Sequence, residues 1–152
     1  MFKSFAMVYQ PKVVAASVAG TSCMTLFSYI YSAVKDDYLK EPKLLDKMIY
    51  RVVPSMSKKG SAVSAWALHY AVGLLFAEIY AQTWDMAGLI PGLKHGLAFG
   101  AVSGVAAVGI WWLTLKTHPI PPSVTFSKHA VNLLIAHLIF GAVTAVCYKN
   151  RP

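Results

Sequence analysis

Residues 13–34 read VVAASVAGTSCMTLFSYIYSAV and contain no charged side chain. A run of about 20 apolar residues is long enough to cross the hydrocarbon core of a bilayer as one helix. No proline falls inside the run, so nothing in it interrupts helical hydrogen bonding. The stretch therefore predicts a transmembrane helix, and this prediction decides the fold class.

Three further stretches meet the same criterion, at about residues 61–84, 93–115 and 126–148. Prolines lie between the four stretches, and Trp and Tyr residues lie near their ends, where amphipathic rings favour the membrane interface. We predict an all-α polytopic membrane protein. We expect residues 1–152 to form a single integral membrane domain, a bundle of four transmembrane helices whose spans are residues 13–34, 61–84, 93–115 and 126–148.

The composition argues against a soluble domain. Hydrophobic residues make up 57% of the 152 residues and charged residues 13%, against roughly 25% charged in ordinary soluble domains. Mean hydropathy is +0.53. A soluble chain of this length needs a larger polar exterior, whereas lipid removes that need. The net charge is +8, but the basic residues lie between the apolar runs, which favours anionic lipid headgroups over nucleic acid as their partner.

The segment between the first two spans, residues 35–60, contains the sequence EPKLLDKMIYRVVP. Pro42 suits the first turn of a helix and Pro54 suits its end. Apolar residues recur at helical spacing on one side, with charged residues on the other, so we predict an amphipathic helix in this first loop. Two interpretations are open: the helix lies in the headgroup plane, or it caps the bundle without contacting lipid.

Nine of the 14 Lys and Arg residues fall on the membrane side that carries the 35–60 loop, and five fall on the other side. Basic residues near spans are retained in the cytoplasm. We therefore expect this loop to be cytoplasmic and both termini to lie outside, in what we expect to be a bacterial inner membrane.

The second and fourth spans share a pattern at a fixed offset of 68 positions. The matched residues are His69, Gly73, Ala77 and Tyr80 in one span and His137, Gly141, Ala145 and Tyr148 in the other. This pattern indicates a parallel duplication of a two-helix unit. Coincidence among Ala- and Gly-rich helices is the alternative, and the first and third spans show no clean match. A duplication predicts that both histidines face the interior at similar depth.

Small residues four positions apart let helices approach closely in lipid. Gly73 and Gly141 occupy such positions in the repeat, and the third span carries Gly96, Gly100 and Gly104 in one row. We interpret this row as a tight helix contact, either within the chain or between copies of the chain in a homo-oligomer.

The chain resembles a loose family of small, uncharacterised bacterial inner-membrane proteins of the YagU-like four-helix type. The resemblance covers most of the chain and is carried by AGTSCMTLF in the first span, HYAVGLLFAEIYA in the second and HLIFGAVTAVCY in the fourth. It implies a four-helix architecture. An acid-stress role has been proposed for that family, with no established reaction.

The chain has no catalytic motif of the hydrolase, nucleotide-binding or zinc-protease kinds, so we do not expect an enzyme, and we predict no cofactor. Ionisable and strongly polar residues inside a membrane are costly and often functional. The candidates are His69, His137, Glu78 and Asn132. His95 and His129 lie near span ends, where solvated histidines are expected.

Three interpretations of His69 and His137 are open. The histidines are neutral and bonded to hydroxyl groups such as those of the first span, which is a structural role. Alternatively, together with Glu78 they belong to the polar path of a small transporter or channel component, or they ligate a haem iron or another metal between helices. The first interpretation gives a structural or stress-related membrane protein, and it predicts a packed, dry core. The second predicts a polar cavity at mid-depth.

Overall fold

A computed structural model describes residues 11–35 and 40–149 of the chain. The helices of the described part are α1 (Pro11–Lys35), α2 (Glu41–Val52), α3 (Lys58–Met86), α4 (Leu93–Thr117) and α5 (Phe126–Lys149). All but α2 are long and apolar enough to cross a membrane. Each predicted span lies inside one of these four helices, and the predicted all-α bundle is confirmed.

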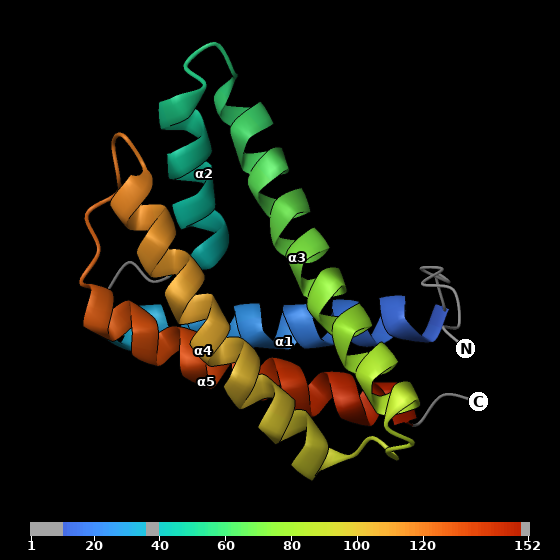
Figure 1. Cartoon of the computed structure of the whole chain (residues 1–152). Coiled ribbons are helices and arrows are strands. Elements are labelled where there is room, and N and C mark those ends of the chain that lie inside the picture. The colour runs from blue at the N-terminus through green and yellow to red at the C-terminus, as the bar shows by residue number, and fades with distance from the viewer. Residues whose placement is uncertain (1–10, 36–39, 150–152) are drawn as a thin grey trace.

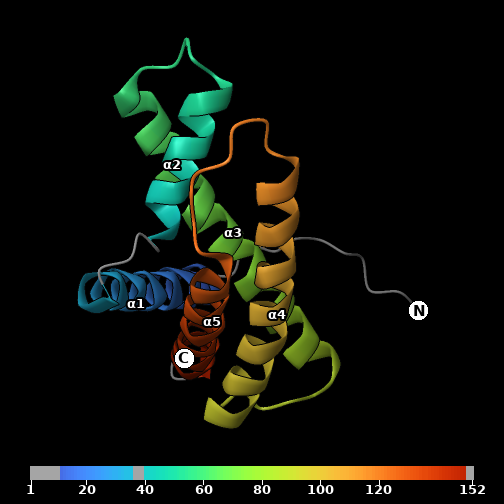
Figure 2. The ribbon, with the colours of Figure 1, turned by 90° about the vertical axis from the view of Figure 1, so that its left-hand side faces the viewer.

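The helices α1 and α5 pack side by side, and α3 and α4 extend beyond them on both sides (Figures 1 and 2). Helix α4 packs along α5, and α3 packs across α1. The α3–α4 turn lies near the beginning of α1 and the end of α5, whereas α2 and the α4–α5 link lie towards the opposite end of the bundle (Figure 1). This arrangement is that of four helices that alternate in direction.

The glycine row of the third span faces α5 of the same chain. A Cβ atom at Gly100 would lie 2.5 Å from the carbonyl oxygen of His137, and one at Gly96 would clash with the carbonyl oxygen of Gly141. Gly104 packs against His137 and Leu134. The absence of side chains at these positions lets the two backbones touch, so the row makes a contact within the chain.

The two glycines of the repeat have corresponding places. A Cβ atom at Gly73 would clash with Thr21 of α1, just as one at Gly141 would clash with Gly96 and Gly100 of α4. In each half of the chain, therefore, the first spanning helix (α1 or α4) packs against the glycine of the second spanning helix (α3 or α5). Ala77 and Ala145, the next residues of the pattern, are both buried.

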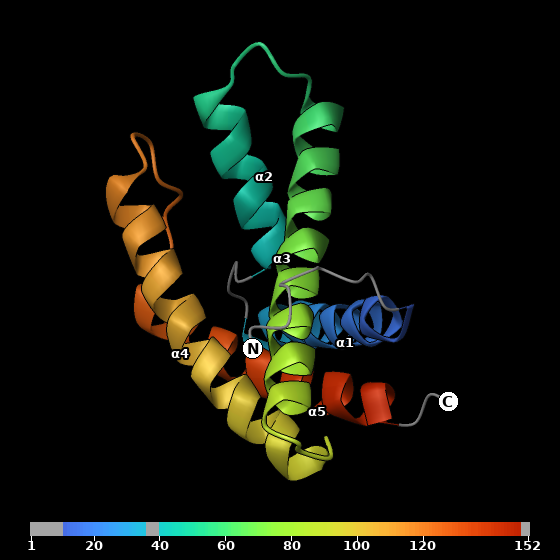
Figure 3. The ribbon, with the colours of Figure 1, turned by 45° about the vertical axis from the view of Figure 1, so that its right-hand side comes forward.

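Helix α2 does not lie apart from the bundle. It packs along the first half of α3 (Figure 3), and its apolar side, with Leu44 and Met48, is buried. At its end, Arg51 donates to the carbonyl oxygen of Ile120 (3.1 Å), and His118 donates to that of Met48 (3.2 Å). The predicted amphipathic helix is present, and its end is hydrogen-bonded to the α4–α5 link.

The beginning of α2 reaches deep into the bundle. Its first residue, Glu41, accepts a hydrogen bond from Ser28 of α1. Ser28 precedes the end of α1 by seven residues, which corresponds to about 10 Å along a helix axis. The loop between the first two spans thus folds back between them, which its amphipathic pattern alone did not predict.

Candidate functional site

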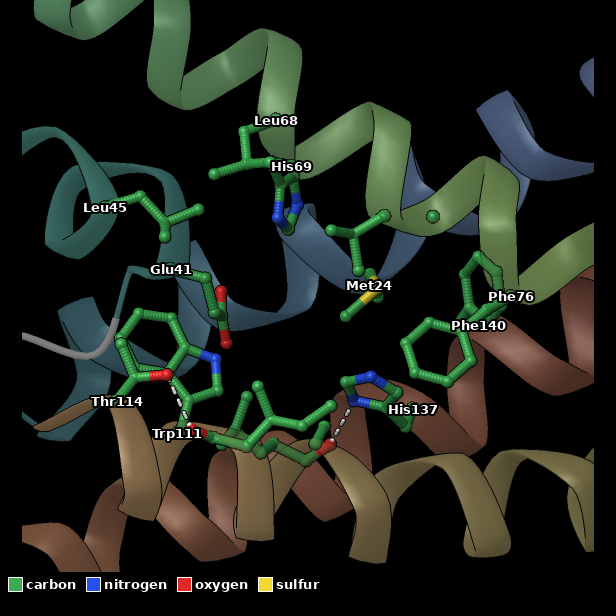
Figure 4. A pocket seen from close by; sticks show the side chains of 15 residues that line it. Met24, Glu41, Leu45, Leu68, His69, Phe76, Trp111, Thr114, His137 and Phe140 are labelled. Carbon is green, nitrogen blue, oxygen red and sulfur yellow. Dashed lines mark hydrogen bonds between the residues drawn. The ribbon is translucent and has the colours of Figure 1, made fainter. Parts of the chain in front are cut away.

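A cavity of about 280 Å³ lies between the helices, and all five of them contribute to its wall (Figure 4). Most of the lining side chains are apolar. The polar ones are Glu41 from α2, His69 from α3, His137 from α5 and Thr114 from α4, together with the indole of Trp111. The site is therefore an apolar chamber with a few polar groups from different helices, which is the usual composition of a small-molecule site.

Glu41 is the acidic group of the cavity and is only 2% exposed. Its Oε1 accepts hydrogen bonds from Ser28 Oγ (3.0 Å) and Asn132 Nδ2 (2.7 Å). Its Oε2 is buried and has no hydrogen-bond partner among the described residues. Burial raises the pKa of Glu41 to about 7, although hydrogen bonds from its own backbone N–H, from Ser28 and from Asn132 oppose the shift.

His69 is held by the hydroxyl stripe of α1. Thr25 donates its hydroxyl proton to the carbonyl oxygen of Thr21 (2.6 Å) and lies 2.8 Å from Nε2 of His69. Because a hydroxyl has only one proton to donate, Nε2 of a neutral His69 must be the donor to Thr25. Its Nδ1 is then an acceptor with a lone pair, and it has no partner among the described residues.

His137 is held by its own helix. Its Nδ1 lies 2.9 Å from the carbonyl oxygen of Leu133, and a carbonyl can only accept, so Nδ1 carries the proton. Nε2 of a neutral His137 is then the acceptor. Both histidines are buried and line the same cavity, in agreement with the inward orientation expected from the repeat, and they use opposite tautomers.

The cavity opens on the side where α3 and α4 diverge. These helices touch near their connecting turn, where Tyr80 donates to the carbonyl oxygen of Phe99 (3.0 Å), and they separate towards the other end (Figure 3). Leu68 of α3 and Ile110 of α4 line the cavity and are also 45% and 56% exposed. The opening is therefore bordered by exposed apolar side chains of both helices.

The candidate residues from the sequence do not all belong to this site. Asn132 is fully buried and reaches it through Glu41, and it also donates to Ser28 Oγ (3.1 Å). Glu78 does not line the cavity. It is half-buried and accepts from Gln82 of the next helical turn (2.9 Å). The carboxyl group near the histidines is that of Glu41, not of Glu78.

Two residues differ from the sequence expectation. Glu41 lies in the segment that the sequence predicts to be an extramembrane loop, yet it is buried inside the bundle, and its place in the first helical turn next to Pro42 is the local feature that marks its position. His129, expected to be solvated, is completely buried, with both ring nitrogens unpaired among the described residues. It packs edge-on against Trp111 with ring centroids 4.8 Å apart, a contact between helices that no spacing in the sequence predicts.

The cavity gives little support to a haem between the histidines. Its volume is just below the roughly 300–1,000 Å³ of typical small-molecule pockets, so a porphyrin would have to displace the lining side chains. Within the described residues, no group of three or more His, Cys, Asp or Glu side chains is placed to hold a metal ion.

Comparison with known proteins finds no match to a protein family, to a curated protein or to a solved structure. The class of protein therefore rests on the fold itself. Four long apolar helices, packed through close glycine contacts, make this chain a polytopic α-helical membrane protein.

Proposed function

We propose that this protein binds a small, largely apolar molecule in the cavity between its helices and acts as a small transporter or channel component without enzymatic activity. The observation that carries the proposal is the cavity with His69, His137 and Glu41 in its wall. The structural interpretation of the histidines instead requires a packed, dry interior.

The wall chemistry supports binding of an amphipathic solute better than conduction of ions. A path for ions needs polar groups along its whole length, whereas here apolar side chains dominate. The glycine contacts of α3 with α1 and of α5 with α4 bring the backbones of these cavity-lining helices close together. An opening between α3 and α4 gives a solute dissolved in the bilayer a direct route to the histidines.

The test compares two alanine positions on α4 that are neighbours in sequence. Ala107 is buried and lines the cavity, whereas Ala106 is exposed. Ala107→Phe fills the cavity, and Ala106→Phe adds the same side chain on the outer face. In proteoliposomes, uptake of labelled small amphipathic solutes should depend on the wild-type protein, be lost in Ala107→Phe and survive in Ala106→Phe. Equal uptake with both variants, or none above empty vesicles with the wild type, would leave the structural role.

We place the protein in a bacterial inner membrane, with the 35–60 loop in the cytoplasm and anionic headgroups next to its basic residues. The distribution of Lys and Arg supports this orientation. The structural or stress-related role expected from the sequence is the alternative to solute binding. Self-association stays a proposal, and the packing of α5 on the glycine row supports the exposed outer faces of the helices as its surface.

A further inference from the structure

The polar groups of the cavity are nearly all hydrogen-bond acceptors. The N–H groups of both histidines are used, by Thr25 and by the carbonyl oxygen of Leu133, which leaves Nδ1 of His69 and Nε2 of His137 as acceptors. Thr114 donates its hydroxyl proton to the carbonyl oxygen of Ile110 (2.7 Å). Among the side chains that line the cavity, only the indole N–H of Trp111 lacks an acceptor in the described residues.

Glu41 adds a carboxyl group to these acceptors. Figure 4 shows it pointing into the space between His69 and Trp111. Its Oε2 is buried and has no hydrogen-bond partner in the part of the chain that the structure describes, a costly arrangement that a hydrogen-bond donor of a ligand would relieve. Within residues 11–35 and 40–149 the carboxyl group has no Lys or Arg partner: its side-chain hydrogen bonds come from the neutral groups of Ser28 and Asn132. When Glu41 is ionised, its carboxylate therefore has no positive charge beside it among the described residues.

The remaining wall suits the apolar body of such a ligand. Phe76, Trp111 and Phe140 line the same cavity. Aromatic faces attract organic cations within about 6 Å, and the attraction is strongest where water is excluded. Acceptors at one end and aromatic rings around the rest fit a molecule with a donor-rich positive head and an apolar body.

Building on the proposed function, we infer that the ligand is a small lipophilic ammonium ion, which enters between α3 and α4 and places its N–H groups against Glu41 and the two histidine nitrogens. A phospholipid is too large for a cavity of about 280 Å³, so the occupant is a free organic amine in its charged form.

The experiment uses three probes of nearly one shape: benzylammonium, benzyl alcohol and toluene. Their dissociation constants are measured by NMR titration of the full chain in nanodiscs at about pH 8.5, where both benzylammonium and Glu41 are ionised. The wild type should bind benzylammonium most tightly and toluene least. Equal affinity for all three probes would overturn the ammonium assignment and leave the proposed function intact.

Glu41→Gln is the decisive variant. It keeps Oε1 as the acceptor for Ser28 and Asn132, and it replaces the unpaired Oε2 by an NH₂ group. It should weaken benzylammonium binding about ten- to a hundredfold and leave toluene binding nearly unchanged. Glu78→Gln is the matched control, because Glu78 lies in α3 outside the cavity wall, and it should leave all three affinities unchanged. An equal effect of the two variants would contradict the inference.

Two further comparisons separate the possible failures. If none of the probes binds better to the wild type than to Ala107→Phe, the proposed function itself fails.

The second comparison is between two kinds of nanodisc. Nanodiscs of phosphatidylglycerol contain no amine, and a second set contains phosphatidylethanolamine. Equal benzylammonium affinity in both sets supports a free ligand. A loss of affinity restricted to the second set would show that a lipid headgroup occupies the site and would overturn the assignment to a free amine.

Discussion

At the scale of single residues, Glu41 connects stability to pH. Burial raises its pKa from an ordinary 4.5 to about 7, so the folded state favours the protonated form. This contribution is fully present below pH 4.5 and is lost as the pH rises to about 7. The shift corresponds to about 3 kcal/mol. Relative to Glu41→Gln, the wild type should lose about this much stability across that range, measured by thermal unfolding in detergent at a series of pH values.

The hydrogen bond between Thr25 and His69 makes a second prediction. Thr25→Val keeps the shape of the side chain but leaves the buried Nε2–H of His69 without an acceptor. The variant should lose about 1–3 kcal/mol of stability. Thr83→Val is the control, since Thr83 is bonded only to its own helix, through the carbonyl oxygen of Ile79, and should lose about 0.5 kcal/mol or less. Similar losses in both variants would show that the contact with His69 contributes nothing.

At the scale of helices, the contact between α4 and α5 depends on the absence of a side chain at Gly100. Gly100→Leu places a branched side chain against the backbone of His137 and Leu138 and should cost about 3 kcal/mol or prevent folding. Gly109 lies on the same helix with open space around its Cα, so Gly109→Leu tests the same substitution without the clash. Thermal unfolding and expression yield compare the two, and equal behaviour would place α4 away from α5.

The sequence predicts the helices well because lipid allows few structures. A segment that spans the bilayer must satisfy its own backbone hydrogen bonds, so length and hydropathy suffice to locate α1, α3, α4 and α5. The glycine row and the inward side of His69 and His137 follow from helical spacing, because small and polar residues avoid lipid. These features are periodic and local, and a pattern in the chain can reveal them.

The residues that line the cavity, by contrast, come from distant parts of the sequence. The hydrogen bond from Asn132 to Glu41 joins residues that are 91 positions apart, and only the path of α2 brings them together. Five residues separate Glu41 from the end of α1, and nothing in their composition predicts that α2 begins inside the bundle. Glu78 stands inside an apolar run and therefore attracts attention, yet it pairs with Gln82 at the helix surface. A hydropathy pattern identifies ionisable residues that lie within spans. It misses an ionisable residue such as Glu41, which a helix outside the spans places between the spanning helices.

At the scale of the whole molecule, the orientation in the membrane is open to a direct test. Ser57 and Met86 lie near opposite ends of α3, and both are exposed. In a background with Cys23→Ala and Cys147→Ala, we expect an impermeant maleimide to label Met86→Cys in intact cells and Ser57→Cys only after permeabilisation. Ser4→Cys and Asn150→Cys, at positions outside the described residues, should label like Met86→Cys. The opposite pattern would reverse the orientation.

The molecule as a whole is a membrane bundle in which a helix that does not span the bilayer supplies the acid of an internal cavity. Infrared difference spectroscopy of the protein in lipid measures this placement most directly, since subtracting Glu41→Gln from the wild type isolates one carboxyl group. We predict a carbonyl band of protonated Glu41 that persists from acid pH up to about 7. A band that disappears near pH 4.5, the ordinary value, would place Glu41 in water and contradict the inward path of α2.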